Sequence, residues 1–271
     1  MALMVWGTSS NTGKTTICSV ICRHLYRKGI DVVPFKGLNL SSKTHTLDSG
    51  LEIGIGQALQ AWACGKEPSV DMNPILLKPE NGRILQIVKG TVLENDRKLD
   101  RTELLEYSCD SYDDLSECHE MIICEGSGSP SEINIQSTDI ANIGIVRKRS
   151  MDIILIGDIE RGGLFASVYG TWLLTPEDIR PRLRGFVINR FRGDVSILYS
   201  GIRRIEELTG MVCLGVMPYV DIDLPEEDHT TVGRVNICQK DLISEYLKSI
   251  DAITDIAEDN LRFDLLDSFI R

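Results

Sequence analysis

The stretch Gly7-Thr-Ser-Ser-Asn-Thr-Gly-Lys-Thr-Thr16 lies between an apolar run and a segment with helical periodicity. The run 2–6 has the length and character of a buried parallel strand, and residues 16–28 place their apolar side chains at helical spacing. A loop in that position points backbone N–H groups, and the positive end of the helix, at an anion. An ordinary Gly/Ser/Thr turn is the plainer alternative, but it leaves the joint occurrence of strand, Gly-Lys-Thr and helix unexplained. The sequence therefore predicts a phosphate-binding loop.

Residues of this loop have distinct expected roles. Gly13 lets the backbone approach the phosphates, Lys14 can reach the β and γ oxygens, and Thr15 can place its hydroxyl on Mg²⁺. The usual pattern has a glycine six residues before the lysine. Here Thr8 occupies that place and the glycine is Gly7. The loop residues that we expect to bind the nucleotide are Thr8, Ser9, Asn11, Thr12, Gly13, Lys14, Thr15 and Thr16.

The length, charge and cysteine pattern indicate an ordinary globular protein and argue against nucleic-acid binding and membrane spanning. The 271 residues suffice for one large α/β domain, and a formal net charge of −11 argues against a nucleic-acid surface. No apolar run is long enough to span a bilayer, and the chain enters its first predicted strand at once, which leaves no room for a signal peptide. We therefore expect a cytoplasmic protein. Its eight cysteines include no CxxC pair and are best interpreted as reduced, packed thiols.

Apolar runs alternate with helix-length segments along most of the chain. A short strand is predicted at 31–36 and a helix at 52–64, despite its glycines. Four further apolar runs follow at Met121–Cys124, Ile153–Gly157, Gly185–Ile188 and Val212–Met217. This alternation predicts an α/β fold with an open, mainly parallel sheet and helices on both faces.

Two regions depart from this alternation. Residues 65–120 are less regular, and in them we expect a hairpin around 84–92 and an acidic helix over 100–120. Residues 221–228 are acidic and loop-like, and an acidic amphipathic helix pattern begins at Asp241. We therefore predict a phosphate-loop domain over 1–232 and an acidic helical tail over 233–271. The tail pattern fits either a packing helix or a surface for a partner.

Acidic side chains near the ends of the predicted strands are candidates for a metal site. Ligands of open parallel sheets gather at the carboxyl edge of the strands. Glu125 follows Met-Ile-Ile-Cys, and an acid in that position can coordinate the Mg²⁺ of a bound nucleotide. A surface acid in a turn is the alternative interpretation. Glu52 and Asp48 are both candidates for a second metal-binding acid, and a solvated loop acid fits either of them nearly as well.

Positive charge is needed locally because the chain as a whole is acidic. Lys36 ends a predicted buried strand and is the best candidate, with Lys78 and Arg161 behind it; a solvated side chain is the common alternative for each. Asn189 ends the run Gly-Phe-Val-Ile, where its amide could pair with an adenine edge or simply form a turn.

The chain resembles the synthetase domain of the cobyric acid synthase family from residue 2 to about residue 230. The loop variant with Gly7 is that of the dethiobiotin synthetase and cobyrinate amidase group. The segments that carry the resemblance are Gly7–Thr15, Pro34–Lys36, Glu52–Gly54, Gln57–Gln60, Val70–Pro79, Glu125–Asn134, Asp139–Asn142, Asp158–Gly163 and Gly185–Asp194.

The resemblance implies an ATP-dependent ligase. ATP would phosphorylate a side-chain carboxylate of a corrinoid to an acyl phosphate, which ammonia would convert to an amide, as in cobalamin biosynthesis. Lys14 and Thr15 would hold phosphate and metal, Glu125 and Glu52 would complete the Mg²⁺ site, and Asn189 would face the adenine. Lys36 would stabilise the transferring phosphate, so Lys14, Lys36 and Glu125 are the expected catalytic residues. Phosphoryl transfer depends mostly on positioning and charge neutralisation, which these residue types supply.

The chain also departs from the family pattern. Ile55 stands where the family has an arginine, and Ser49, beside Asp48, stands where it has an acid. The family continues into a glutaminase domain with a Cys–His–Glu triad, and none of the eight cysteines here has the strand–turn–helix context of such a nucleophile. We therefore expect ammonia from a separate source, either free ammonium or a glutaminase subunit. The pattern leaves the oligomeric state open.

Three alternatives remain open at this point. A carboxylase like dethiobiotin synthetase would use the same phosphate loop. A nucleotide switch of the partition-ATPase kind, or a relative that binds a corrinoid without catalysis, would be a non-ligase. The combination of Lys14-Thr15, Glu125 and Asp158-Ile-Glu-Arg-Gly-Gly163 is found in the amidase family and favours the ligase.

Overall fold

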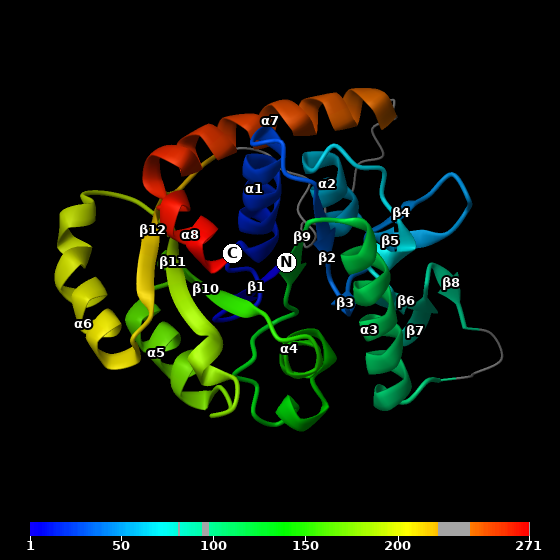
Figure 1. Ribbon diagram of the computed structural model, residues 1–271, viewed down its shortest axis with the longest axis horizontal. Coiled ribbons are helices and arrows are strands. Elements are labelled where there is room, and N and C mark those ends of the chain that lie inside the picture. The colour runs from blue at the N-terminus through cyan, green and yellow to red at the C-terminus, as the bar shows by residue number, and fades with distance from the viewer. Residues whose placement is uncertain (81, 94–97, 222–238, 271) are drawn as a thin grey trace.

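A computed structural model describes residues 1–80, 82–93, 98–221 and 239–270. Its centre is a six-stranded sheet in the order β12-β11-β10-β1-β9-β2, in which every neighbouring pair is parallel (Figure 1). The strands are β1 (Ala2–Gly7), β2 (Val32–Phe35), β9 (Met121–Glu125), β10 (Asp152–Asp158), β11 (Leu183–Phe191) and β12 (Val212–Pro218). The open, parallel sheet expected from the alternation is confirmed.

The sequences of these strands are continuous apolar runs because helices cover both faces of the sheet. In β1, Leu3 and Val5 pack into the hydrophobic cluster on one face, whereas Met4 and Trp6 pack into the cluster on the other. All four side chains are almost completely buried. The phosphate loop therefore begins at the carboxyl end of a central strand that is buried on both faces.

Helices cover both faces, as the sequence predicts. One face carries α1 (Lys14–Arg27), α2 (Ile55–Ala63), α7 (Gln239–Asn260) and α8 (Phe263–Phe269). The other carries α3 (Arg101–Cys118), α4 (Ile145–Lys148), α5 (Leu164–Leu174) and α6 (Tyr199–Thr209). The acidic helix expected over 100–120 is α3, and it begins with a capping box between Asp100 and Glu103.

The irregular region forms two small sheets beside the main one. A four-stranded sheet has the order β3-β6-β7-β8, and β4 pairs antiparallel with β5. These strands are β3 (Asn39–Leu40), β4 (Thr44–Thr46), β5 (Glu52–Gly54), β6 (Ile75–Glu80), β7 (Arg83–Val88) and β8 (Thr91–Val92). The hairpin expected around 84–92 is β7–β8. The predicted helix start at Glu52 is wrong, because 52–54 pairs as a strand and the helix begins at Ile55.

Short helical turns connect several of these elements. They are the 3₁₀ turns Val70–Met72, Gln136–Thr138, Arg180–Arg182 and Val195–Leu198, and the π-helical turn Ile140–Gly144, which leads into α4.

The tail packs onto the domain. Helix α7 crosses α1 and α2 (Figure 1), with Tyr246, Ile250, Ile253 and Ala257 in the shared core. Arg23 of α1 donates to both carboxylate oxygens of Asp251, at 2.7 and 2.9 Å. Of the two interpretations of the tail pattern, a packing helix is the one that the structure contains. The boundary at 232–233 and most of the acidic segment 221–228 lie outside the described residues.

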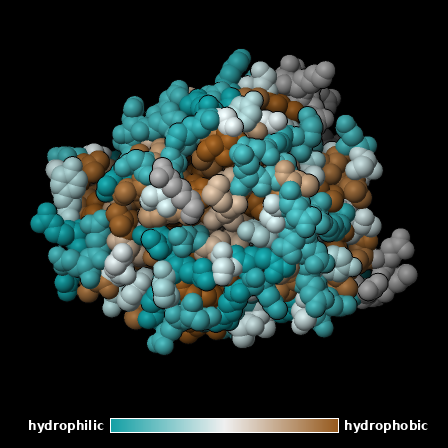
Figure 2. All heavy atoms as spheres, in the orientation of Figure 1, coloured by the Kyte–Doolittle hydropathy of each residue, from teal (hydrophilic) through white to brown (hydrophobic). Residues whose placement is uncertain are grey.

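The surface is largely hydrophilic on the side seen in Figure 2. No helix within the described ranges is long and apolar enough to cross a membrane. All seven cysteines in those ranges are free, and six of them are buried, which fits the expectation of packed thiols; Cys238 lies outside those ranges.

We predict that Ile250→Ala destabilises the whole protein, because Ile250 is fully buried between α7 and the sheet-facing helices. Removing a buried isoleucine side chain in this way costs about 2 to 5 kcal/mol of unfolding free energy. Urea denaturation measures the change. Ile197→Ala is the matched control, because that side chain is 68% exposed. An Ile250→Ala protein as stable as the control would contradict the integration of α7 into the core.

Candidate active site

The phosphate loop leaves the end of β1 and enters α1. The Thr8 N–H donates to the Ile156 carbonyl of β10 at 3.0 Å, which fixes the start of the loop on the sheet. Gly13 precedes the first residue of α1 with a φ of +90°, a conformation that glycine adopts readily. A Cβ there would lie 2.1 Å from Asn189 Nδ2, so a larger residue would displace the Asn189 amide.

Asn189 and Arg190, at the end of β11, hold this loop from the side. Asn189 Nδ2 donates to the Thr12 carbonyl at 2.8 Å, and Arg190 Nη1 donates to the Asn11 carbonyl at 2.8 Å. Arg190 also pairs with Asp158, the last residue of β10, at 3.0 Å. The adenine contact expected for Asn189 stays a prediction, and the structure gives its amide nitrogen a role in shaping the loop.

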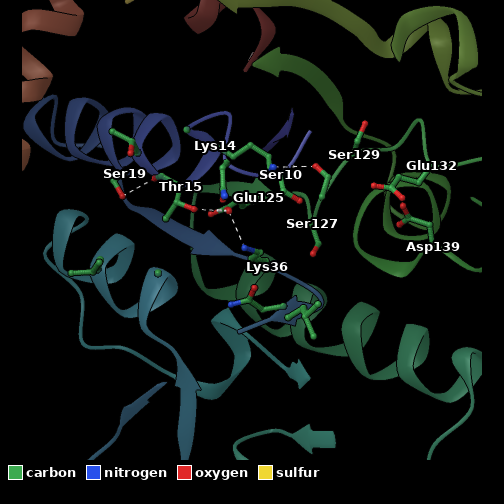
Figure 3. Close-up of a pocket in the computed structure, with 18 of the residues that line it drawn as sticks. Ser10, Lys14, Thr15, Ser19, Lys36, Glu125, Ser127, Ser129, Glu132 and Asp139 are labelled. Atoms are coloured by element: carbon green, nitrogen blue, oxygen red, sulfur yellow. Dashed lines mark hydrogen bonds and ion pairs between the residues drawn. The ribbon is translucent and has the colours of Figure 1, made fainter. Parts of the chain in front are cut away.

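Lys14 lies folded over the loop. Its Nζ donates to the Ser9 carbonyl at 2.9 Å and to the Gly128 carbonyl at 3.0 Å, and the side chain is almost completely buried. The lysine therefore joins the loop after β1 to the loop after β9, as Figure 3 shows. A cation in this position faces the cavity in which phosphates would bind.

Glu125, at the end of β9, is the centre of the site. Its Oε1 accepts hydrogen bonds from Thr15 Oγ1 at 2.8 Å and from Lys36 Nζ at 2.9 Å. Its Oε2 accepts from Gln60 Nε2 at 2.5 Å, and Gln57 Nε2 lies 3.5 Å away. Two strand-end residues, Lys36 and Glu125, and Thr15 in the first turn of α1 are therefore in direct contact, as the sequence led us to expect.

Burial alone would raise the pKa of Glu125, which is 1% exposed. The charge of Lys36 and its hydrogen bond, together with the charge of Lys14, outweigh burial and lower the pKa. Glu125 is therefore ionised at neutral pH, as a metal ligand must be.

The oxygen atoms of Thr15 and Glu125 fit a Mg²⁺ site. Within the described ranges no group of three or more His, Cys, Asp or Glu residues gathers to hold a metal. Mg²⁺ does not need such a cage, because it commonly binds through one or two carboxylates, waters and substrate phosphates. A hydroxyl and an ionised carboxylate, in contact beside a lysine-lined cavity, supply that donor set.

The other charged candidates lie away from this centre. Glu52 pairs with Lys78 at 2.8 Å on the small sheets, and neither side chain lines the cavity. Asp48 is exposed in the turn between β4 and β5, and Arg161 is exposed after β10. The metal role expected for Glu52 stays a prediction, which this arrangement does not bring to Glu125.

A cavity of about 440 Å³ joins these groups. Beyond the Lys14–Gly128 contact the cavity is also lined by Ser127, Ser129, Glu132 and Asp139 (Figure 3). Burial raises the pKa of Asp139 despite the hydrogen bonds it accepts from Asn142 and Ile143. The cavity thus has a cationic side suited to phosphate and a side of hydroxyls and carboxyls.

Some residues at the site were not assigned a role from the sequence. Gln57 and Gln60, which contact Glu125, are fully buried on an otherwise apolar helix. Polar side chains spaced by three residues on a buried helical face are a usable signal of such a contact. Ser19 and Tyr246 also line the cavity. For Tyr246 the sequence gives no signal, because it fits the apolar pattern of a packing helix.

Comparisons with known proteins show the family to which the chain belongs. The family model described as CobQ/CobB/MinD/ParA nucleotide binding domain matches residues 3–232. A probable cobyric acid synthase of Methanoculleus marisnigri is 44% identical over 86% of this chain and 48% of its own length. The cobyric acid synthase of Cutibacterium acnes is 44% identical over 86% of this chain and 49% of its own length.

The chain spans about half the length of these curated relatives. Among solved structures, the MinD cell division protein of Aquifex aeolicus is 14% identical, with a TM-score of 0.46 over 95% of each chain. That score is too low to bear on function.

We predict that Glu125→Gln lowers the unfolding free energy by about 3 to 5 kcal/mol, because it removes the counter-charge of the buried Lys36. Glu52→Gln is the control, since its pair with Lys78 is partly exposed and such pairs contribute about 0 to 1 kcal/mol. Because the folded pKa of Glu125 is lowered, its stabilisation is present above the unfolded pKa of about 4.3 and is lost as the pH falls through the folded value.

Chemical denaturation across that pH range measures both effects. The difference between wild type and Glu125→Gln should be full at neutral pH and shrink on acidification. A difference that is absent at neutral pH, or that grows as the pH falls, would contradict the ionised pair.

Proposed function

Because the chain belongs to the CobQ/CobB/MinD/ParA nucleotide binding domain family, we propose that it is an ATP-dependent ligase that forms amides on the carboxylates of a corrinoid. The proposed reaction converts cobyrinic acid a,c-diamide to cobyric acid in cobalamin biosynthesis. The observation that carries this proposal is the contact of Thr15 and Lys36 with one ionised carboxylate, Glu125, beside Lys14 and in one cavity. The names of the curated relatives support the corrinoid substrate.

The first step would be phosphoryl transfer. A carboxylate oxygen of the substrate attacks the γ-phosphorus of ATP, the bond from that phosphorus to the β–γ bridging oxygen breaks, and ADP leaves. Lys14 and Lys36 carry positive charge on the same side of the cavity, where the transferring phosphoryl group would lie. Fixed charges of this kind stabilise the transition state without reorganising during the reaction. Bound Mg²⁺, held by Thr15 and Glu125, would neutralise phosphate charge.

The second step would be amide formation. Ammonia attacks the carbonyl carbon of the acyl phosphate, inorganic phosphate leaves, and the nitrogen loses a proton to the solvent or a nearby base. Glu132 and Asp139 also line the cavity and are the carboxyl groups in position to accept that proton. Burial raises the pKa of Asp139, which favours a role as a base.

The direct test is mass spectrometry after incubation with ATP, Mg²⁺, ammonium and candidate tetrapyrroles. Amidation replaces a hydroxyl by an amino group, so each amide appears as a unit-mass loss. Incorporation of labelled bicarbonate would instead favour the carboxylase. ATP turnover without any change of the corrinoid would favour a nucleotide switch.

We predict that Lys14→Ala lowers ATP turnover on the order of 10²- to 10³-fold, as removal of one preorganised charge in a transition-state site does. Lys66→Ala is the matched control, because Lys66 pairs with Asp31 on the surface and does not line the cavity. Steady-state ATPase assays measure turnover, and circular dichroism checks the fold. Wild-type turnover in a folded Lys14→Ala protein would rule out the assignment of the phosphate loop.

We also predict that the 271-residue chain uses free ammonium and not glutamine. Burial raises the pKa of Cys18, Cys22 and Cys124, which makes these thiols poor nucleophiles. Ammonia must be uncharged to attack, so amide formation should increase with pH as the NH₃ fraction rises. Parallel assays with ammonium and glutamine decide the matter. Glutamine-dependent amidation by the unaltered chain would contradict this prediction, and its loss in Cys118→Ser would identify Cys118, the exposed thiol of the described ranges, as the missed nucleophile.

A further inference from the structure

The segment Asp158–Gly163 is not used by the proposed reaction, yet its first residue is connected to the phosphate loop through Arg190. Asp158 ends β10, and its Oδ2 accepts a hydrogen bond from Arg190 Nη1 at 3.0 Å. Its Oδ1 accepts from the Glu160 N–H at 2.8 Å, so both carboxylate oxygens are engaged. The Asp158 side chain is only 9% exposed. Asp158 therefore fixes the direction of the guanidinium, which also donates to the Asn11 carbonyl at 2.8 Å.

Arg190 and Asn11 both have a left-handed backbone conformation. Their φ angles are +63° and +59°, and they are two of the three non-glycine residues with a positive φ in the described ranges. Such residues are uncommon, and they cluster at ligand sites, where surrounding contacts hold them in place. Here the two residues are hydrogen-bonded to each other, and both line the cavity. Their contact is therefore a candidate for a role in ligand binding.

Two consecutive carbonyls of the loop accept hydrogen bonds from the end of β11. Arg190 donates to the carbonyl of Asn11, and Asn189 Nδ2 donates to the next carbonyl at 2.8 Å, that of Thr12. In a trans peptide the N–H points opposite to the C=O, and no peptide bond in the described ranges is cis. The N–H groups of Thr12 and Gly13 therefore point away from the two side chains that hold the carbonyls. Neither N–H has a hydrogen-bond partner among the described residues.

The side to which these N–H groups point carries the centre of the site. In the sheet, β9 and β11 lie on opposite sides of β1, so the direction away from β11 is the direction of β9. The end of β9 and the loop after it contribute Glu125 and Ser127 to the cavity. Backbone N–H groups beside a helix N-terminus bind phosphate. A side chain that holds a carbonyl on the β11 side thus prepares the loop for an anion on the β9 side.

We infer that Arg190 is a positioning residue for the nucleotide. Its guanidinium, directed by Asp158, holds the Asn11 carbonyl and thereby turns the Thr12 N–H toward the phosphates. Arg190 acts through the loop and not through its own contact with phosphate. The inference rests on the proposed function, because it takes an adenine nucleotide as the ligand.

The test is the binding of ADP to the full chain without added metal, measured by isothermal titration calorimetry. Arg190→Asn removes the guanidinium, and asparagine tolerates the left-handed backbone conformation. The loss of one charge-assisted hydrogen bond that orients the loop predicts ADP binding about 5- to 50-fold weaker. Arg192→Asn is the matched control, because Arg192 stacks on Tyr219 and does not line the cavity. Its affinity for ADP should equal that of the wild type.

Asp158→Asn separates positioning from a direct attraction between the guanidinium and phosphate. Positioning predicts weaker ADP binding, because the guanidinium is no longer directed at the loop. Direct attraction predicts tighter binding, because a negative charge beside the cation has been removed. Since Asp158 acts through Arg190, the double variant should bind ADP no more weakly than Arg190→Asn alone.

ADP affinity in Arg190→Asn that equals that of Arg192→Asn would overturn the inference, and so would tighter binding by Asp158→Asn. Circular dichroism at the titration temperature checks that each variant is folded. If Arg190→Asn does not fold, the direction of the change in Asp158→Asn decides between the two explanations. A wild type that binds neither ADP nor ATP would overturn the proposed function and this inference with it.

Discussion

The buried ion pair between Lys36 and Glu125 is the constraint on which the site depends. Both side chains are almost completely buried, and removing either charge would leave the other with a large desolvation cost that is less well compensated. The pair joins the ends of two adjacent strands, β2 and β9, and the same carboxylate receives Thr15 from the first turn of α1. Three segments that are distant in sequence are therefore held at one point, with the cavity directly beside them (Figure 3).

Parallel pairing explains why the strand-end residues could be predicted from the sequence. Parallel strands bring their carboxyl ends to the same edge, so polar residues directly after apolar runs were expected to meet there. Lys36 and Glu125 do meet, and Asn189 lies against the loop that holds Lys14. The boundaries of the long strands were also accessible, because a strand buried on both faces is a continuous apolar run.

The remaining features depend on side-chain partners that are remote in sequence. Glu52 lies in a segment that matches the family motif and was expected to bind Mg²⁺. In the structure an ion pair with Lys78 holds its side chain beside the small sheets. The glycine-containing start of the predicted helix at 52 pairs as a strand, because β4 offers it a hydrogen-bonding edge. Tyr246 fits the period of a packing helix equally well whether its hydroxyl faces protein or cavity. Periodicity identifies the buried face and does not identify which buried group meets a ligand.

The position of α7 has a consequence for the order in which the protein can fold. Arg23 and Asp251 are separated by 228 residues, and the face of α1 that carries Ile21 and Leu25 packs in the same cluster as α7. During synthesis the part of α1 that α7 covers stays exposed until residues near 250 have left the ribosome. Contacts of such large sequence separation form late and slow the folding of a domain. Helix α1 is thus synthesised early, but its packing is complete only when α7 has docked. Nucleotide affinity should therefore appear after most of the sheet has formed.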